Sequence, residues 1–168
     1  GIIEKSDYTR ATLRLNNDYD LTSHFRLGHN INFAYEDDQR SPLGVVRVLY
    51  YADGTIAPRN AEGESNDLNL RGSVGNPAAA IHYTRWDGTA ARLVGNLFAD
   101  YDITSSITFR SSFGVDYGRE DTRDFVPTFF VSPTQRNTTS RLNVETHSIN
   151  TWLWENTATY NYNAANHR

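Results

Sequence analysis

The chain has 168 residues and a formal net charge of −4, and it contains no cysteine. The lack of cysteine excludes disulfides and thiolate metal sites, and the absence of any basic stripe argues against nucleic acid as a partner. No apolar run approaches the about 18 residues of a transmembrane helix, and the abundance of Tyr, Phe and Thr is typical of strands.

An alternation of apolar and polar residues predicts five antiparallel strands in up-and-down order, and therefore an all-β fold. The predicted strands cover residues 8–18, 23–36, 91–103, 106–118 and 148–162. All of them exceed the usual strand length of about 5–6 residues. They also reach the about 9–11 residues that a tilted strand needs to cross a bilayer.

Nearly the same phrase stands at two places, DYDLTSHF at residues 18–25 and DYDITSSI at residues 100–107. Each copy lies between two predicted strands, and we expect a short turn there because Asp, Ser and Thr side chains bond their own backbone. The other connections are long, at residues 37–90 and 119–147. Such loops are uncommon in compact domains. Short turns at one end and long loops at the other are typical of outer-membrane barrels.

Each predicted strand has one apolar and one polar face, which a membrane barrel would turn toward lipid and lumen respectively. The lipid-facing side chains would include Leu13, Leu27, Phe33, Leu97 and Phe113. The lumen-facing side chains would include Arg10, Arg14, Arg26 and Arg110. Aromatic residues stand near both ends of the strands, as in the interfacial girdles of barrels. The same alternation also fits a soluble or secreted β-sandwich binding module, in which the apolar face packs against a second sheet.

Five strands are too few for a membrane barrel, which needs about eight or more. An open sheet edge in lipid would leave backbone groups without hydrogen-bond partners. We therefore expect this chain either to be part of a longer one or to share a barrel with other copies. The absence of methionine, even at residue 1, favours a piece of a longer chain.

Five stretches form an ordered series along the chain: SDYTRATLRLNNDYDLTSHFRLGHNINFAYED, YYADGT, VGNPAAAIHY, ARLVGNLFADYDITSSITFRSSFGVDY and WLWENTATYNYNAANHR. This series resembles the SusC/RagA family of TonB-dependent outer-membrane transporters of Bacteroidetes. The first and fourth stretches look like early barrel hairpins of the family, and the second and third look like its first long extracellular loop. The resemblance covers nearly the whole chain and is weakest at residues 118–147.

The resemblance implies a segment of a large transmembrane barrel of the type with about 22 strands, whose lumen holds an N-terminal plug. It also implies import of glycans or oligopeptides across the bacterial outer membrane. TonB would pull on the plug, a SusD-like lipoprotein would cover the extracellular face, and the lipid bilayer would surround the barrel. We expect the plug to be absent from these residues, so that this stretch alone does not transport.

The first long loop contains the candidates for contact with substrate or partner, Tyr83, Arg85, Trp86 and Asp87. An aromatic ring beside polar groups suits the binding of a sugar or a peptide. The alternative is that these side chains pack against the lipoprotein or against neighbouring loops. The lumen-facing arginines also have two interpretations, namely pairing with the plug or touching substrate.

The sequence predicts neither an enzyme nor a cofactor. Its five histidines lack the spacing of metal ligands, and it has no Gly-x-Ser-x-Gly motif. Its acidic pairs lie in predicted turns and loop ends, and no EF-hand loop follows them. We therefore expect no catalytic site and no metal site.

Overall fold

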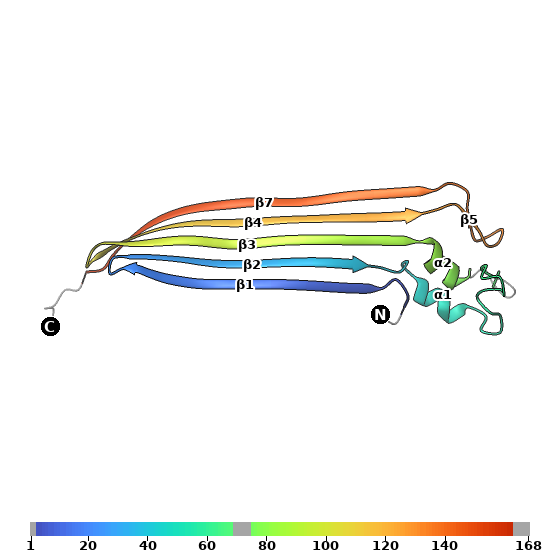
Figure 1. Ribbon diagram of the computed structural model, residues 1–168. Coiled ribbons are helices and arrows are strands. Elements are labelled where there is room, and N and C mark those ends of the chain that lie inside the picture. The colour runs from blue at the N-terminus through green and yellow to red at the C-terminus, as the bar shows by residue number, and fades with distance from the viewer. Residues whose placement is uncertain (1–2, 69–74, 163–168) are drawn as a thin grey trace, which may run out of the picture. The chain divides into compact units, whose positions relative to one another are not determined.

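The computed structural model describes residues 3–68 and 75–162. Five long strands form one sheet in the order β1-β2-β3-β4-β7, and neighbouring strands run antiparallel (Figure 1). They are β1 (Asp7–Thr22), β2 (Phe25–Gln39), β3 (Arg85–Thr104), β4 (Ile107–Val126) and β7 (Arg141–Tyr160). The expected all-β, antiparallel fold is thus confirmed. Within the described ranges, β1 and β7 each have a strand neighbour on one side only, so the sheet is open.

The chain forms two compact units. Unit 1 comprises Gly1–Thr9, Glu36–Thr89 and Glu120–Thr146, and unit 2 comprises Arg10–Tyr35, Ala90–Arg119 and His147–Arg168. Every long strand contributes residues to both units. The two short turns belong to unit 2, whereas the two long connections belong to unit 1.

The repeated phrase of the sequence forms two equivalent turns in unit 2. Thr22 Oγ1 accepts a hydrogen bond from the His24 N–H, and Thr104 Oγ1 accepts one from the Ser106 N–H, both at 3.2 Å. A threonine side chain that bonds the backbone two residues further on stabilises a tight turn. The carbonyl groups of His24 and Ser106 each accept a further hydrogen bond, at 2.9 Å, from the chain segment beside them. The repeat is therefore a repeat of turn chemistry.

The long connections are shorter than expected. The loop predicted at 37–90 is a connection over residues 40–84, and the loop predicted at 119–147 is a connection over residues 127–140. Residues 69–74 of the first predicted loop lie outside the described residues. The strands extend further than predicted. Most of the added residues of β4 are polar or charged, whereas those of β7 include the exposed Leu142 and Val144 on one face.

Polar side chains join these added strand residues to their neighbours in unit 1. Thr146 Oγ1 donates a hydrogen bond to Asp121 Oδ1 at 2.6 Å, which joins β7 to β4. Gln39 Nε2 donates one to Asp87 Oδ1 at 3.2 Å, which joins β2 to β3. Cross-strand pairs of this kind stabilise a sheet where no apolar face is buried.

The two long connections contain short elements of their own. The first holds α1 (Val45–Tyr51) and α2 (Pro77–Tyr83), and the second holds the paired strands β5 (Phe129–Phe130) and β6 (Arg136–Asn137). The small core of unit 1 consists of Val45, Leu68, Ala79 and Ile81. No helix in the part of the chain that the structure describes is long and apolar enough to cross a membrane.

Helix α2 begins with a strong helix-start signal, an N-cap residue followed by proline. Asn76 is its N-cap, and the Asn76 side chain accepts hydrogen bonds from the N–H groups of Ala78 and Ala79. Pro77 follows at the first helical position, where its missing N–H costs nothing. At the other end, Lys5 Nζ donates to the carbonyls of Ile81 and His82, both at 2.8 Å. Both ends of this short helix are therefore satisfied.

Candidate functional site

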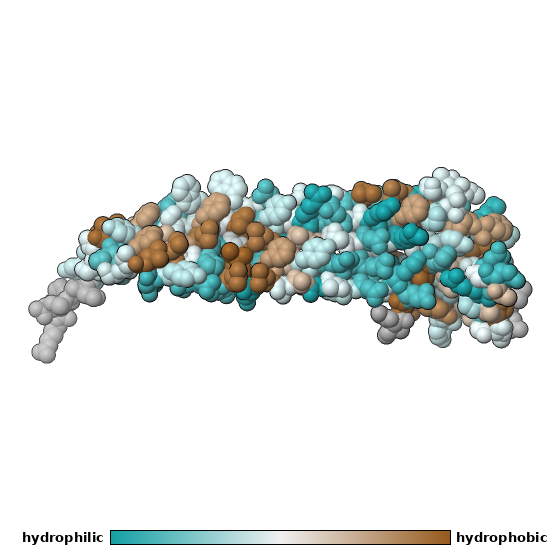
Figure 2. Space-filling model, in the orientation of Figure 1, coloured by the Kyte–Doolittle hydropathy of each residue, from teal (hydrophilic) through white to brown (hydrophobic). Residues whose placement is uncertain are grey.

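One face of the unit 2 sheet carries apolar side chains at alternating positions. The five residues predicted to face lipid lie on it with exposures between 38% and 53%. They are Leu13, Leu27, Phe33, Leu97 and Phe113. At that exposure, no second layer of the described chain covers the face. In Figure 2, hydrophobic side chains gather over the strands of unit 2 on the visible side.

Contacts between neighbouring strands establish that these five residues share one face. The contacts join residues of even number, so the residues of odd number between them point the opposite way. The bridging pairs are Asp20–Arg26, Gly28–Phe98 and Asn96–Ser112. The strands β1, β2, β3 and β4 therefore keep one common alternation in unit 2.

Strand β7 adds two indole rings to the apolar face. The rings of Phe113 and Trp152 are stacked with their centroids 6.4 Å apart, and Trp154 Nε1 donates a hydrogen bond to Ser111 Oγ at 3.0 Å. Trp152 is 67% exposed and Trp154 is 64% exposed. Two indoles with this exposure are unusual for a surface that meets only water, because each offers a large apolar area.

The opposite face of unit 2 carries ion pairs. Arg92 donates two hydrogen bonds to Asp116, at 3.0 and 2.7 Å, and Arg110 donates two to Asp100, at 2.5 and 2.6 Å. Arg26 pairs with Asp20 at 2.9 Å. By the alternation of β1, Arg10 and Arg14 belong to the same face. The four arginines predicted to face the lumen are thus on one side of the sheet, opposite the apolar residues.

One aromatic ring lies on the polar face instead of the apolar one, and its contacts explain why it is tolerated there. Phe98 lies on the polar face, where its ring covers Gly28: a Cβ atom at Gly28 would stand 2.3 Å from Phe98 Cζ. The Phe98 ring has a second contact: the Arg110 guanidinium lies 4.7 Å from the ring centroid. The ring therefore fills the space left by a glycine and provides a cation–π surface to an arginine.

The four residues predicted as loop contacts do not form one site. Tyr83 ends α2, and its ring stacks on Phe129 with centroids 4.4 Å apart. Arg85, Trp86 and Asp87 are not loop residues, because they open β3. Asp87 accepts the hydrogen bond from Gln39, so its carboxylate is part of the sheet. Of the four, Trp86 lines a cavity of unit 1 that Tyr83, Arg85 and Asp87 do not line.

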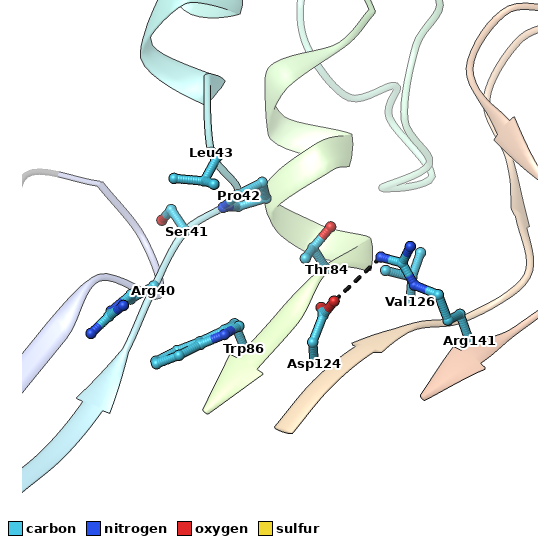
Figure 3. A pocket seen from close by; sticks show the side chains of 9 residues that line it. All are labelled: Arg40, Ser41, Pro42, Leu43, Thr84, Trp86, Asp124, Val126 and Arg141. Carbon is cyan, nitrogen blue, oxygen red and sulfur yellow. Dashed lines mark hydrogen bonds and ion pairs between the residues drawn. The ribbon is translucent and has the colours of Figure 1, made fainter. Parts of the chain in front are cut away.

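The Trp86 cavity has a volume of about 410 Å³ and is lined by residues from four strands or their ends (Figure 3). Arg40 and Trp86 lie on one side of it, and Asp124 and Arg141 lie on the other. The Arg40 guanidinium stands 4.3 Å from the indole centroid. Arg141 Nη2 donates to Asp124 Oδ2 at 3.3 Å. Pro42, Leu43 and Val126 add apolar surface.

Sequence reasoning found only one member of this cavity. Arg40, Asp124 and Arg141 are far from Trp86 in sequence and carry no spacing signal that links them to it. They meet because the strand order places β2 and β4 on either side of β3, and β7 next to β4. The signal that the chain did offer was the Asn76–Pro77 step, which marks the start of α2 and so limits the loop before β3.

The position of Lys5 beside α2 lowers the pKa of its side chain. Partial burial lowers the pKa of Lys5, and the neighbouring charge of Arg85 lowers it further. The Lys5 ammonium nevertheless has two carbonyl acceptors at the end of the helix. Its role there is that of a helix C-terminal cation.

Within residues 3–68 and 75–162, no group of three or more His, Asp or Glu side chains is arranged to hold a metal ion. No protein-family model matches the chain, and no curated protein is similar enough in sequence to align with it.

Proposed function

We propose that this chain is part of the barrel of an outer-membrane, TonB-dependent nutrient importer of the SusC/RagA kind. The observation that carries the proposal is the segregation in unit 2. Apolar and charged side chains occupy opposite faces of one sheet layer, and both faces are exposed. A bilayer would cover the apolar face, and a water-filled lumen would solvate the ion pairs.

The positions of tyrosines support the same orientation. Tyr19 and Tyr101 stand near the short turns and are 48% and 51% exposed. Tyr35 and Tyr117 stand at the other end of the unit 2 strands and are 43% and 44% exposed. Two belts of exposed tyrosine on either side of an apolar band match the interfacial girdles of membrane barrels.

The rival hypothesis, a soluble β-sandwich module, needs a second sheet against the apolar face. In the part of the chain that the structure describes, the only other sheet is the two-residue pair β5–β6, which belongs to unit 1. The sandwich hypothesis therefore has to bring its second layer from outside the described residues. The barrel hypothesis needs only lipid on that face.

In the proposed role, further strands close the barrel, and the short turns lie in the periplasm. TonB acts through a plug that these residues do not supply, and a SusD-like lipoprotein covers the extracellular end. The substrate class is glycans or oligopeptides. The long connections of unit 1 then lie on the extracellular side, which puts the Trp86 cavity where a substrate arrives.

Neighbouring single-cysteine variants test the proposal, because the chain has no cysteine of its own. Leu97→Cys belongs to the apolar face and Asn96→Cys to the polar face. In isolated outer membranes of cells that produce the protein, a water-soluble maleimide should label Asn96→Cys and spare Leu97→Cys. A nitroxide at Leu97 should respond to lipid-dissolved oxygen. Equal labelling of both positions in water would contradict a lipid-facing sheet.

A further inference from the structure

We infer that the Trp86 cavity binds an acidic saccharide, with a carboxylate of the sugar on Arg141 and the sugar ring against the indole. The inference deepens the proposed function, since it names the class of nutrient, and its role in uptake rests on that function. The binding chemistry that it assigns rests on the cavity alone. Its volume, about 410 Å³, lies within the about 300–1,000 Å³ of ligand pockets.

The ion pair at the cavity is weaker in geometry than the pairs on the unit 2 sheet. Arg141 makes one contact to Asp124, at 3.3 Å, and the Arg141 side chain is 69% exposed. By contrast, Arg92 and Arg110 each hold their carboxylate with two hydrogen bonds of 3.0 Å or less. A guanidinium has five N–H donors in a planar fork. Arg141 therefore keeps donors for the two oxygens of a ligand carboxylate.

The second arginine fixes the ring that would carry the sugar. Arg40 pairs with Asp38 at 2.5 Å and stacks on Trp86 at 4.3 Å. The backbone N–H of Arg40 also donates to the Trp86 carbonyl at 3.3 Å. The two residues are therefore in contact through their side chains and through their backbones. A ring held in this way loses little further freedom on binding, which favours affinity.

The charges of the lining select the ligand. Two arginines and one aspartate line the cavity, and Asp38, which pairs with Arg40, is not among the lining residues. Because Asp38 balances the charge of Arg40, the cation with donors to spare is Arg141, whose single contact with Asp124 leaves it able to bind an anionic ligand. Asp124 is an acceptor-only group that suits the hydroxyls of a sugar. An apolar ring, a guanidinium and a carboxylate together fit a uronate.

Binding of defined oligosaccharides to the protein, extracted from its membrane in detergent, tests the inference. The probes are tetragalacturonate and its methyl ester, which has the same shape without the charge. Titration calorimetry should give at least tenfold tighter binding of the acid than of the ester, with affinity falling as salt rises. Equal binding of acid and ester, or no binding of the acid at millimolar concentration, would overturn the inference. So would equal binding of tetraglutamate.

Variants assign the binding to the cavity. Arg141→Gln and Trp86→Leu should each weaken tetragalacturonate binding about tenfold or more. Arg47→Gln is the matched control, because Arg47 is an exposed arginine of unit 1 that does not line the cavity. Heat-dependent mobility in detergent shows that each variant is folded. Unchanged affinity in Arg141→Gln would overturn the assignment.

The outcomes separate this inference from the proposed function. The cysteine labelling at Leu97 and Asn96 uses no ligand, so a lipid-facing sheet without uronate binding refutes the inference alone. Uronate binding together with water labelling of Leu97→Cys refutes the membrane proposal and leaves the saccharide site standing.

Discussion

The replacement Asn76→Ala should loosen the first long connection of unit 1. Asn76 is fully buried, and its side chain accepts two hydrogen bonds from α2 and donates two to the carbonyls of Pro58 and Asn66, at 2.7 and 2.9 Å. Loss of the helix cap costs about 1 kcal/mol. The Asn66 carbonyl loses its Asn76 donor, which costs about 1–3 kcal/mol, whereas the Pro58 carbonyl keeps the Asn66 N–H at 3.1 Å. We therefore expect a local loss of about 2–4 kcal/mol.

Hydrogen exchange measures this loss where it occurs. At about 1.4 kcal/mol per factor of ten, the amides of Ala78, Ala79 and Ala80 should exchange about 30 to 700 times faster in Asn76→Ala. The variant Asn76→Ser keeps a capping oxygen and should lose only the part due to the Asn66 carbonyl. The internal control is the amide of Asp102, which lies in β3 near a short turn of unit 2 and donates to the His24 carbonyl.

Two results would refute this reasoning. Unchanged exchange in α2 would mean that the four hydrogen bonds of Asn76 do not hold the connection. Equal acceleration in α2 and at Asp102 would mean that the variant acts by global unfolding, so that the two compact units do not open separately.

Three further changes test the unit 2 sheet. Leu97→Arg should cost about 2–4 kcal/mol of folding free energy in lipid vesicles, measured by urea titration, whereas Leu97→Val should cost little; an arginine tolerated without cost contradicts a lipid-facing position. Gly28→Ala should cost about 1 kcal/mol because the new Cβ would stand 2.3 Å from Phe98 Cζ and 2.5 Å from Asp18 Oδ1 and so displace both side chains; a double-mutant cycle with Phe98→Ala should remove the part of the cost due to the ring. Replacing Arg92 with Gln and Asp116 with Asn together should leave the urea midpoint nearly unchanged, since exposed ion pairs contribute little; a large drop would show that this pair is shielded from water.

The alternation of residues was sufficient to predict the sheet of unit 2. Side chains in a strand alternate with a period of two, so the placement of Leu97 opposite Asn96 follows from sequence once the strand is recognised. The turns were predictable as well, because Thr22 and Thr104 occupy the same place in a repeated phrase and make the same backbone hydrogen bond.

The remainder of unit 1 was not predictable in the same way. Residues 85–90, 119–126 and 141–147 form strands, and their pairing depends on neighbours that are distant in sequence. Trp86 was recognised as a candidate for its chemistry but was assigned to a loop. Its cavity partners are brought to it by strand order, which a local pattern does not specify.

The open edges of the sheet restrict where these five strands can be stable. Every described residue of β1 and β7 is exposed, and each strand offers a row of backbone groups to one unpaired side. In lipid, each unpaired group costs several kcal/mol; in water, a long unpaired edge invites association with other chains. The apolar face with its two indoles adds a second surface that water does not favour. Neither solvent alone therefore stabilises the sheet as an isolated layer, and its stability requires further strands on both edges. Strands from the same chain would give a barrel of fixed size, whereas strands from other copies would make the fraction of folded sheet rise with protein concentration. Sedimentation in detergent over a hundredfold concentration range distinguishes the two, because only closure by copies predicts a shift in mass.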